Sequence, residues 1–431
     1  MPIAILTTIG LLFVLLGTGA WVSLSLMGVG IGSLTLFRSI PVDKLLAQSV
    51  WNGLSSPELV ALPLFILMAE LLYRSRFTNN LFASLEPWVR NLPGGLLHTN
   101  VLGCTFFALI SGSSAATTSA IGRLTLPELE KRGYNRAMSM GSLAGAGTLG
   151  FLIPPSIIMI IYGVLSQTSV IKLFAAGIIP GLVLALMFMG YLALASFFVP
   201  RAQAKEEQGR EGIWGERLRG IPSLLPFVGL MAAVLGSMYA GLASPSEAAA
   251  LAVGLTCLVM LIERSLSWKV IKESCIGAAR TASMLGLIIA AASFLSVAMG
   301  FLGLPQAVSA YIKSMELGPI ALITLLLLIY VLLGCFLEGM SLMVMTLPIV
   351  IPLITGAGYD KIWFGVFLII VIEMAQITPP VGINLFVIQG LTREKMYRIA
   401  LSAVPFFLIM VCFVYLITFF PQIVTYLPGL V

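Results

Sequence analysis

Four short segments rich in small, polar or proline residues interrupt apolar stretches of the sequence, and their oxygen atoms could bind ions. Two of them, 111–118 (SGSSAATT) and 338–341 (EGMS), have apolar arms on both sides, and the other two, 145–156 (GAGTLGFLIPPS) and 376–384 (QITPPVGIN), contain a Pro-Pro pair. Proline interrupts the hydrogen bonding of a helix and leaves backbone carbonyl oxygens free; together with hydroxyl oxygens these are suitable ligands for an alkali cation. The N-termini of half-helices can bind an anionic group. The candidate ion- and substrate-binding residues are Ser111, Gly112, Ser113, Ser114, Thr117, Gly147, Thr148, Pro154, Pro155, Glu338, Gly339, Ser341, Gln376, Thr378, Pro379, Gly382 and Asn384.

Each of these features also has a structural interpretation. Small residues in an apolar helix are commonly packing contacts, and an isolated Pro-Pro is commonly a kink. Because a polar tip and a Pro-Pro break recur at matched positions in both halves of the chain, we favour a pair of binding sites. Three carboxylates lie in apolar segments. Glu338 is equally well explained as a helix cap or as a functional group, and for Glu373 a structural role is slightly favoured. Glu70 can reach the membrane interface near Arg74.

The composition places these segments in a membrane. The chain is 59% hydrophobic and 10% charged, with a mean hydropathy of +1.05, whereas soluble domains are about one quarter charged. The net charge is +6, and the basic residues lie in short loops between the apolar segments. This distribution reports the orientation of the chain in the membrane and does not indicate a nucleic acid partner. The chain has one histidine, His98, which disfavours a metal or catalytic site based on histidine. Its five cysteines form no CxxC pair and are expected to be buried, inert thiols; they are Cys104, Cys257, Cys275, Cys335 and Cys412.

The elements that position the four segments are apolar helices. We predict an all-α polytopic membrane protein with about ten transmembrane spans and two re-entrant helical hairpins, at 99–130 and 318–355. The predicted spans are 3–17, 20–37, 57–73, 137–163, 171–198, 222–240, 246–262, 281–303, 362–390 and 399–428, and the predicted amphipathic interfacial helices are 40–55, 77–92 and 265–279. The first span is expected to be retained, since no basic region precedes it. The chain therefore divides into a first half (1–200), a hydrophilic cytoplasmic linker (201–221) and a second half (222–431).

The two halves are predicted to be inverted repeats. Four landmarks recur at one constant spacing, which we call the repeat offset: Lys44 and Lys269, Pro127 and Pro352, Gly133-Tyr134 and Gly358-Tyr359, and Pro154-Pro155 and Pro379-Pro380. With the N-terminus outside, nineteen of the 24 basic residues lie in inner loops and five in outer ones, namely Arg38, Lys44, Lys172, Lys313 and Lys361. This bias supports five crossings per half, which would invert the second copy and leave both termini in the periplasm.

Four motifs together resemble the large membrane subunit of tripartite ATP-independent periplasmic (TRAP) transporters, over essentially the whole chain. They are SGSSAATTSA (111–120), GTLGFLIPPSIIMIIYG (147–163), EGMSLMVMTLPIVIP (338–352) and ITPPVGINLFV (377–387). The resemblance implies an elevator-type protein of the inner membrane that takes up a small organic acid anion with sodium ions and no organic cofactor. It also implies two partners, a periplasmic substrate-binding protein and a separate small four-helix membrane subunit. The sodium ligands that the resemblance implies are Ser113, Ser114, Gly147 and Thr148 in the first half and Gly339, Ser341, Thr378, Pro379 and Gly382 in the second.

Other functions are weighed against this one. A standalone sodium-coupled carboxylate transporter has a similar inverted-repeat design and is the main alternative. A membrane enzyme is disfavoured because no His/Cys/Asp cluster or carboxylate pair converges on one segment, and a channel does not need two matched hairpins. ATP-driven transport is disfavoured because the sequence contains no GxxxxGK[ST] loop. The identity of the organic acid, the sodium stoichiometry and the oligomeric state have no signature in the sequence.

Overall fold

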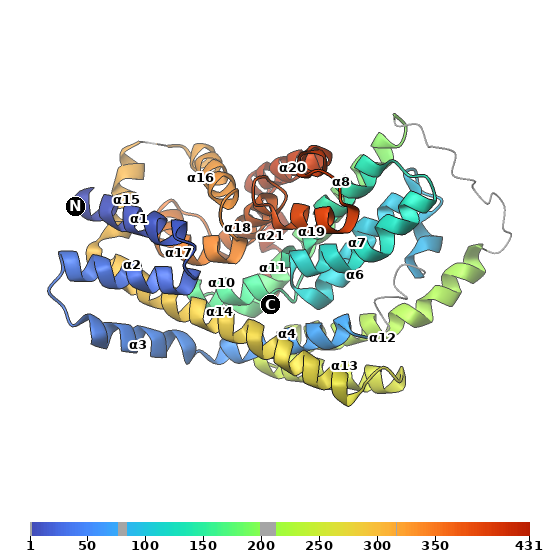
Figure 1. Cartoon of the computed structure of the whole chain (residues 1–431), viewed down its shortest axis with the longest axis horizontal. Helices are drawn as coiled ribbons and strands as arrows, with labels where there is room; N and C mark the ends of the chain where they lie inside the picture. The colour runs from blue at the N-terminus through green and yellow to red at the C-terminus, as the bar shows by residue number, and fades with distance from the viewer. Residues whose placement is uncertain (1, 76–83, 199–212, 316) are drawn as a thin grey trace.

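The computed structural model of the chain describes residues 2–75, 84–198, 213–315 and 317–431 (Figure 1). These residues contain helices and no β-strand, which confirms the prediction of an all-α chain. Most of the predicted linker and the start of the predicted interfacial helix 77–92 lie outside the described residues. Where the description resumes at Ile213, the chain is already helical, so α12 begins inside the segment predicted as linker.

The helices of the two halves follow one another with short connections. In the first half they are α1 (Pro2–Gly17), α2 (Val22–Phe37), α3 (Val42–Leu54), η1 (Pro57–Val60), α4 (Ala61–Tyr73), η2 (Gly95–Leu97), α6 (His98–Ser111), α7 (Ser114–Lys131), α8 (Arg136–Gly147), α9 (Leu149–Leu152), α10 (Ile157–Ser166) and α11 (Val170–Ala195). In the second half they are α12 (Ile213–Tyr239), α13 (Pro245–Ile262), α14 (Trp268–Leu302), α15 (Leu304–Ser314), α16 (Pro319–Gly334), α17 (Gly339–Gly356), α18 (Lys361–Gln376), α19 (Ile383–Thr392), α20 (Met396–Phe419), α21 (Gln422–Thr425) and η3 (Leu427–Gly429).

The repeat offset recurs in the helix bounds and in the turns between helices. Helices α7 and α17 are related by this offset at both ends, and α8 and α18 are related by it at their first residues. The turns before α8 and α18 are built alike, since Gly133 and Gly358 both have a positive φ, of 73° and 87°. Each following helix is then capped by a side chain at the same offset, Asn135 before α8 and Asp360 before α18. The sequence landmarks therefore mark equivalent pieces of local structure.

Five of the described helices are long and apolar enough to cross a membrane, namely α11, α13, α14, α17 and α20. Two bent pairs add to them: α3 with η1 and α4, bent by 60°, and α8 and α9 with α10, bent by 43°. Some predicted spans contain shorter apolar helices, namely α2 and, at the end of the span 362–390, α19. Helix α16, the first arm of the predicted hairpin 318–355, is also a shorter apolar helix. The chain is thus a multi-pass membrane protein, with fewer uninterrupted long helices than the number of predicted spans.

One group of helices forms an outer layer, which we define as α1–α4 and α12–α14. Helix α14 packs against α2, α3 and α4, and α13 packs against α4 and α12, so this layer runs along the long axis of the molecule (Figure 1). The sequence predicted an interfacial helix at 265–279 followed by a span at 281–303, but α14 runs through both as one helix of 35 residues. No proline or glycine lies between residues 278 and 285 to end it, whereas Pro57 interrupts the corresponding part of the first half.

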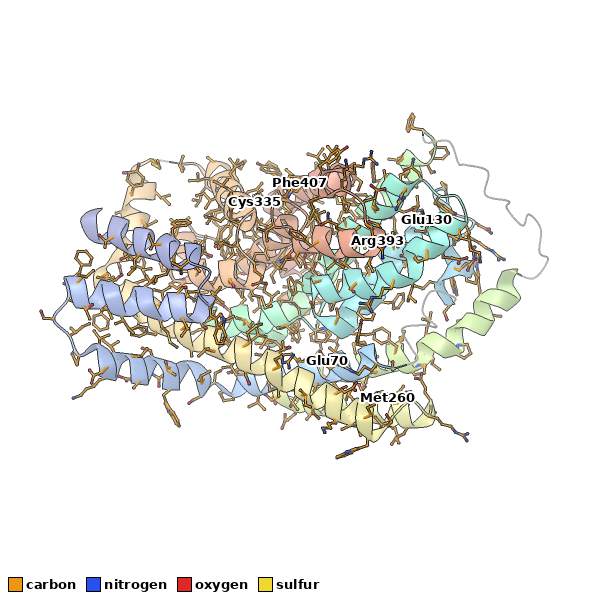
Figure 2. All side chains as sticks on the ribbon, in the orientation of Figure 1. Glu70, Glu130, Met260, Cys335, Arg393 and Phe407 are labelled. Carbon is orange, nitrogen blue, oxygen red and sulfur yellow. The ribbon has the colours of Figure 1, made fainter. Side chains whose placement is uncertain are left out.

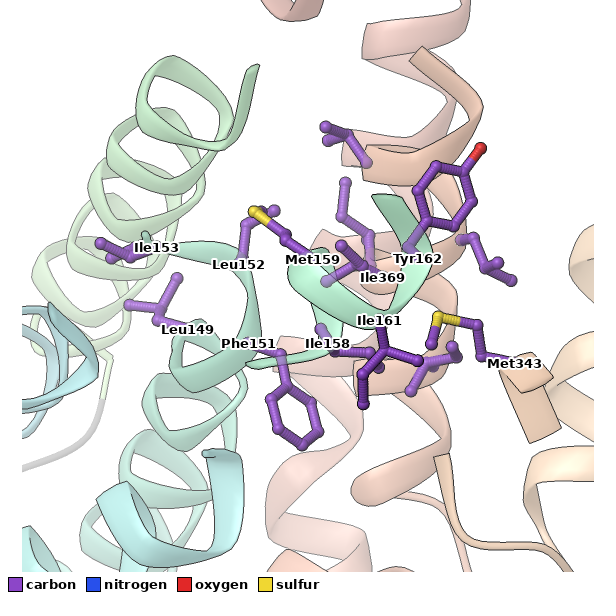
Figure 3. Close-up of a cluster of buried hydrophobic side chains, with 14 of the residues drawn as sticks. Leu149, Phe151, Leu152, Ile153, Ile158, Met159, Ile161, Tyr162, Met343 and Ile369 are labelled. Atoms are coloured by element: carbon purple, nitrogen blue, oxygen red, sulfur yellow. The ribbon is translucent and has the colours of Figure 1, made fainter. Parts of the chain in front are cut away.

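The remaining helices from α6 to α11 and from α16 to α20 form the core bundle, in which α18 is central. Every residue of α18 from 363 to 376 is buried. Helix α8 is buried from 139 to 147 and packs against α20, while α7 packs against α19. The apolar residues around α9 and α10 form a close-packed cluster with Met343 and Ile369 of the second half (Figure 3). Elements of both halves are therefore interleaved around the two Pro-Pro breaks.

Charged side chains lie mainly at helix ends, away from this interleaved centre. Glu70 forms an ion pair with Arg74 near the end of α4, and Glu130 in the last turn of α7 lies 3.8 Å from Arg136 (Figure 2). The same Arg136 reaches the second half, with its Nη1 3.4 Å from Glu394. Among the residues that the structure describes, Glu373 of α18 is the one buried charged side chain.

Candidate functional site

The first polar tip is a tight turn between α6 and α7. Gly112, with a φ of 51°, ends α6, and Ser113 caps α7 by accepting a hydrogen bond from the N–H of Ala116 at 3.4 Å. The hydroxyls of Ser111 and Thr117 lie 2.6 Å apart across the turn. The turn is thereby held by its own side chains, and the first turn of α7 points its N–H groups toward the tip.

This tip lies directly against the first Pro-Pro break. A β-carbon built on Gly112 would lie 3.0 Å from the carbonyl oxygen of Pro155, and one built on Gly150 would lie 2.7 Å from the Cα of Ser114. Both contacts involve backbone atoms, which have little freedom to move. Only glycine at these two positions lets the tip and the break approach so closely.

The break itself spans the end of α8 to the start of α10. Thr148 donates its hydroxyl to the carbonyl of Gly145 at 2.6 Å, and the peptide bond between Pro154 and Pro155 is cis. Ser156 precedes α10 without capping it, and its buried hydroxyl has no hydrogen-bond partner. A buried hydroxyl without a partner is uncommon, and here it stands at a helix N-terminus.

The second tip is capped differently from the first. Glu338 accepts hydrogen bonds from the backbone N–H of Ser341 at 3.0 Å and from its hydroxyl at 3.2 Å, which is the capping geometry considered for it from the sequence. The N–H of Val381 donates to the carbonyl of Cys335 at 3.1 Å, and this bond joins the second tip to the second break.

The second break brings carbonyl oxygens together. A β-carbon on Gly382 would lie 2.9 Å from the carbonyl oxygens of both Gln376 and Thr378. Thr378 donates its hydroxyl to the carbonyl of Met374 at 2.7 Å, and the peptide bond between Pro379 and Pro380 is cis. Each break therefore offers backbone and hydroxyl oxygens beside the tip of its own half.

A buried polar cluster connects the two halves at the centre of the core bundle. Glu373 of α18 is fully buried; its Oε2 accepts a hydrogen bond from Ser114 at 2.8 Å and its Oε1 accepts one from the N–H of Phe151 at 3.0 Å. Ser114 also lies 3.0 Å from the carbonyl of Gly147, and Asn384 donates its Nδ2–H to Ser114 Oγ at 2.7 Å. The first tip, the first break, α18 and the second break all meet at the Ser114 hydroxyl.

Two oxygen atoms in this cluster have no hydrogen-bond partner. They are Thr118 Oγ1 and Asn384 Oδ1, on side chains with no exposed surface. A β-carbon on Gly147 would lie 1.9 Å from Thr118 Oγ1 and 3.4 Å from Asn384 Nδ2, so both side chains crowd the same glycine. Unpaired buried oxygens beside carbonyl groups are a donor set that suits a hard cation.

Neither a basic side chain nor a cluster of metal-binding side chains completes the cluster. In the ranges the structure describes, Glu373 forms no ion pair, and no group of three or more His, Cys, Asp or Glu residues could hold a metal ion. Any ligand of the cluster would therefore be recognised by oxygen atoms and helix N-termini.

The predicted residues are only partly brought together. Ser114, Gly147 and Asn384 belong to the central cluster, whereas Glu338, Gly339 and Ser341 lie at the second tip. Pro154, Pro155 and Pro379 contribute backbone only. The sequence interpretation slightly favoured a structural role for Glu373, and it did not select Thr118 or Phe151. The signal for Glu373 was the high cost of placing a carboxylate in the membrane.

Comparison with protein families relates the whole chain to one transporter component. A family model described as "Tripartite ATP-independent periplasmic transporter, DctM component" matches residues 9–423. A C4-dicarboxylate TRAP transporter large permease protein of Rhodobacter capsulatus is 30% identical over 438 residues, which cover 98% of each protein. A 2,3-diketo-L-gulonate TRAP transporter large permease protein of Escherichia coli is 30% identical and covers 88% of this chain and 89% of its own.

Two further similarities extend this picture. An isethionate TRAP transporter permease protein of Oleidesulfovibrio alaskensis, named DctMQ, is 28% identical over 99% of this chain, which spans 66% of that longer protein. Among solved structures, the YdaH transporter of Alcanivorax borkumensis has a TM-score of 0.62 at 14% identity, with 86% of each chain covered. The latter similarity concerns the fold alone.

Proposed function

Because the chain belongs to the family of DctM components of tripartite ATP-independent periplasmic transporters, and is a large permease of that class, we propose that it takes up a small organic anion together with sodium ions. The observation that carries sodium coupling is the buried cluster around Ser114, where hydroxyl and carbonyl oxygens converge without a basic residue. Hard oxygen ligands of this kind suit an alkali cation. Sodium is here a transported substrate.

We propose two cation sites, one at each tip and its facing break. In the first half the ligands would come from Ser113, Ser114, Gly147 and Thr148, and in the second from Gly339, Ser341, Thr378, Pro379 and Gly382. The converging carbonyls of Gln376 and Thr378 beside Gly382 support the second site. The anionic substrate would bind between the two sites, where the N-termini of α7, α10, α17 and α19 supply N–H groups.

The substrate is proposed to be an organic acid. Relatives are named for C4-dicarboxylates, 2,3-diketo-L-gulonate and isethionate, all of which carry an acidic group. The partners are proposed to be a periplasmic substrate-binding protein and a separate small four-helix membrane subunit, and the name DctMQ of the longer isethionate permease supports the second of these.

The transport movement is proposed to be an elevator motion of the core bundle along the outer layer. The recurrence of helix bounds and turns at the repeat offset supports a repeat, and the distribution of basic loops supports its inversion, with both termini in the periplasm. In an inverted pair, each half would open the site toward a different side of the membrane.

The test is uptake into proteoliposomes that contain the complete transporter, with sodium varied and a binding protein loaded with labelled anion. We expect Ser113→Ala and Thr378→Ala each to raise the sodium concentration for half-maximal uptake several-fold while protein recovery stays the same. A wild-type sodium response in both variants would overturn the cation sites. Uptake without any binding protein would instead favour a standalone carboxylate transporter.

A further inference from the structure

The Ser114 hydroxyl has more neighbours than its single hydrogen can serve. Its oxygen lies 3.0 Å from the carbonyl of Gly147, 2.8 Å from Glu373 Oε2 and 2.7 Å from Asn384 Nδ2. The amide N–H of Asn384 donates to the hydroxyl, so the hydroxyl hydrogen goes either to Gly147 or to Glu373. The choice between these two acceptors decides where the free electron pair of Ser114 Oγ points.

A hydroxyl binds a cation through an electron pair, with its hydrogen directed elsewhere. If Ser114 Oγ and the carbonyl of Gly147 both faced a cation, the hydrogen would have to leave Gly147 for another acceptor. Glu373 Oε2 is that acceptor, and it is held in place because the N–H of Phe151 donates to Oε1 at 3.0 Å. Outer-sphere acceptors of this type orient metal ligands in many proteins.

This arrangement occurs in only one of the two repeats. Glu373 and Asn384 come from the second half, but they support Ser114, Gly147 and Phe151 of the first. At the repeat offset the counterpart of Glu373 is Thr148, whose hydroxyl donates to Gly145 within its own helix. The counterpart of Ser114 is Gly339, which has no side chain.

We propose that Glu373 is a positioning residue for cation binding at the first tip, acting through Ser114, and that it makes the first site non-equivalent to the second. This inference rests on the proposed function, because it assumes that the first tip binds an alkali cation. The ligand of the first site would be a monovalent alkali cation. Asn384 assists because its Nδ2–H donates to the Ser114 hydroxyl oxygen and fixes its position. A purely structural link between the halves is the competing explanation.

The variant that separates the two explanations is Glu373→Gln. Ser114 and Phe151 donate to different oxygens of the carboxylate. Glutamine has nearly the same size, but its donor-only NH2 group replaces one of these oxygens, so one of the two hydrogen bonds is lost. We expect the sodium concentration for half-maximal uptake to rise about tenfold or more, the range typical for loss of an outer-sphere partner. The KM for the organic anion at saturating sodium should stay near the wild-type value.

A matched control removes a different buried link between helices. Asn100, also without exposed surface, donates from Nδ2 to the Ser142 hydroxyl at 2.8 Å and to the Ser139 carbonyl at 3.2 Å. Asn100→Leu should lower the Tm of the purified protein and leave the sodium dependence unchanged. If it shifted the sodium dependence as much as Glu373→Gln does, Glu373 would be a structural residue and the proposal would be wrong.

A double variant tests whether Glu373 acts through Ser114. The combination of Ser114→Ala with Glu373→Gln should raise the half-maximal sodium concentration no further than Ser114→Ala alone, because both changes remove the same ligand. Additive effects would overturn the proposal. If Glu373→Gln is not recovered from the membrane, Glu373→Asp takes its place, since the shorter side chain cannot keep both hydrogen bonds.

Direct cation binding separates failure of this inference from failure of the proposed function. The probe is the Tm of the purified protein in sodium chloride against the same concentration of choline chloride. A wild-type protein that sodium does not stabilise would refute the cation sites, and the positioning role would fall with them. Equal sodium stabilisation of wild type and Glu373→Gln would refute only the positioning role.

Discussion

The close approach of the first tip to the first break gives a sharp test through Gly150→Ala. The added methyl group would lie 2.7 Å from the Cα of Ser114 and 2.8 Å from the carbonyl carbon and oxygen of Ser113. Carbon atoms in ordinary contact are about 3.5–4.0 Å apart, so the tip must recede by roughly 0.8 Å or more. The neighbours are backbone atoms, so a side-chain rotation cannot relieve the contact.

The expected magnitude follows from this displacement. Overpacking in a well-packed interior costs about 1–3 kcal/mol. We assume that the cation-bound state needs the original distance between Ser114 and Gly147, so that sodium binding must overcome this energy. At about 1.4 kcal/mol per factor of ten, the sodium concentration for half-maximal uptake should then rise about 5- to 150-fold. The assay is the sodium dependence of uptake into proteoliposomes, together with the Tm of the purified protein.

Two glycines provide controls for Gly150→Ala. A β-carbon on Gly190 has no neighbour within 4 Å, so Gly190→Ala should change neither the Tm nor the sodium dependence. A β-carbon on Gly141 would lie 2.1 Å from the carbonyl oxygen of Ser402, so Gly141→Ala should lower the Tm and, in the protein that folds, leave the sodium dependence unchanged. A Gly150→Ala protein with wild-type sodium dependence and Tm would refute the argument from close packing.

Two further predictions concern stability alone. Trp363→Phe removes the indole N–H that donates to the Ile417 carbonyl at 2.9 Å but keeps an aromatic ring stacked on Tyr359. We expect the free energy of unfolding to fall by about 0.6–1 kcal/mol, measured as a lower Tm in detergent. An unchanged Tm would contradict a contribution from this hydrogen bond. Ser244→Ala removes the capping box that Ser244 forms with Glu247 and should lower the free energy of unfolding by about 1 kcal/mol, whereas Ser244→Gly should lower it by only a few tenths of a kcal/mol. An unchanged Tm in Ser244→Ala would show that the cap contributes little.

Local features of the fold could be predicted from the sequence because their causes are local. The apolar segments, the Pro-Pro breaks and the glycine turns each depend on residues close together in the chain, and their bounds agree with the predicted ranges to within a few residues at α6, α7, α16 and α17. The continuity of α14 was missed, because a change from amphipathic to apolar pattern was interpreted as a boundary. A helix can change its surroundings without ending where no residue breaks it.

The central cluster could not be predicted, because its partners are distant in the chain. Ser114 and Glu373 are separated by 259 residues, and Ser114 and Asn384 by 270. Hydropathy and motif spacing identify the tip and the break of each half separately. They contain no information on which side chain of one half meets the other, and that pairing depends on how α18 is seated in the bundle.

The packing of α20 on α8 has a consequence for biosynthesis. A β-carbon on Gly145 would lie 2.4 Å from the ring of Phe406, and one on Gly141 would touch the backbone at Ser402, so the glycine face of α8 is covered by a helix that is synthesised near the end of the chain. While the ribosome is still translating the second half, this face has no partner from the same chain. Folding of the first half is then completed only after α20 has entered the membrane, so a chain that stalls between α11 and α20 would leave this face open to membrane chaperones and proteases.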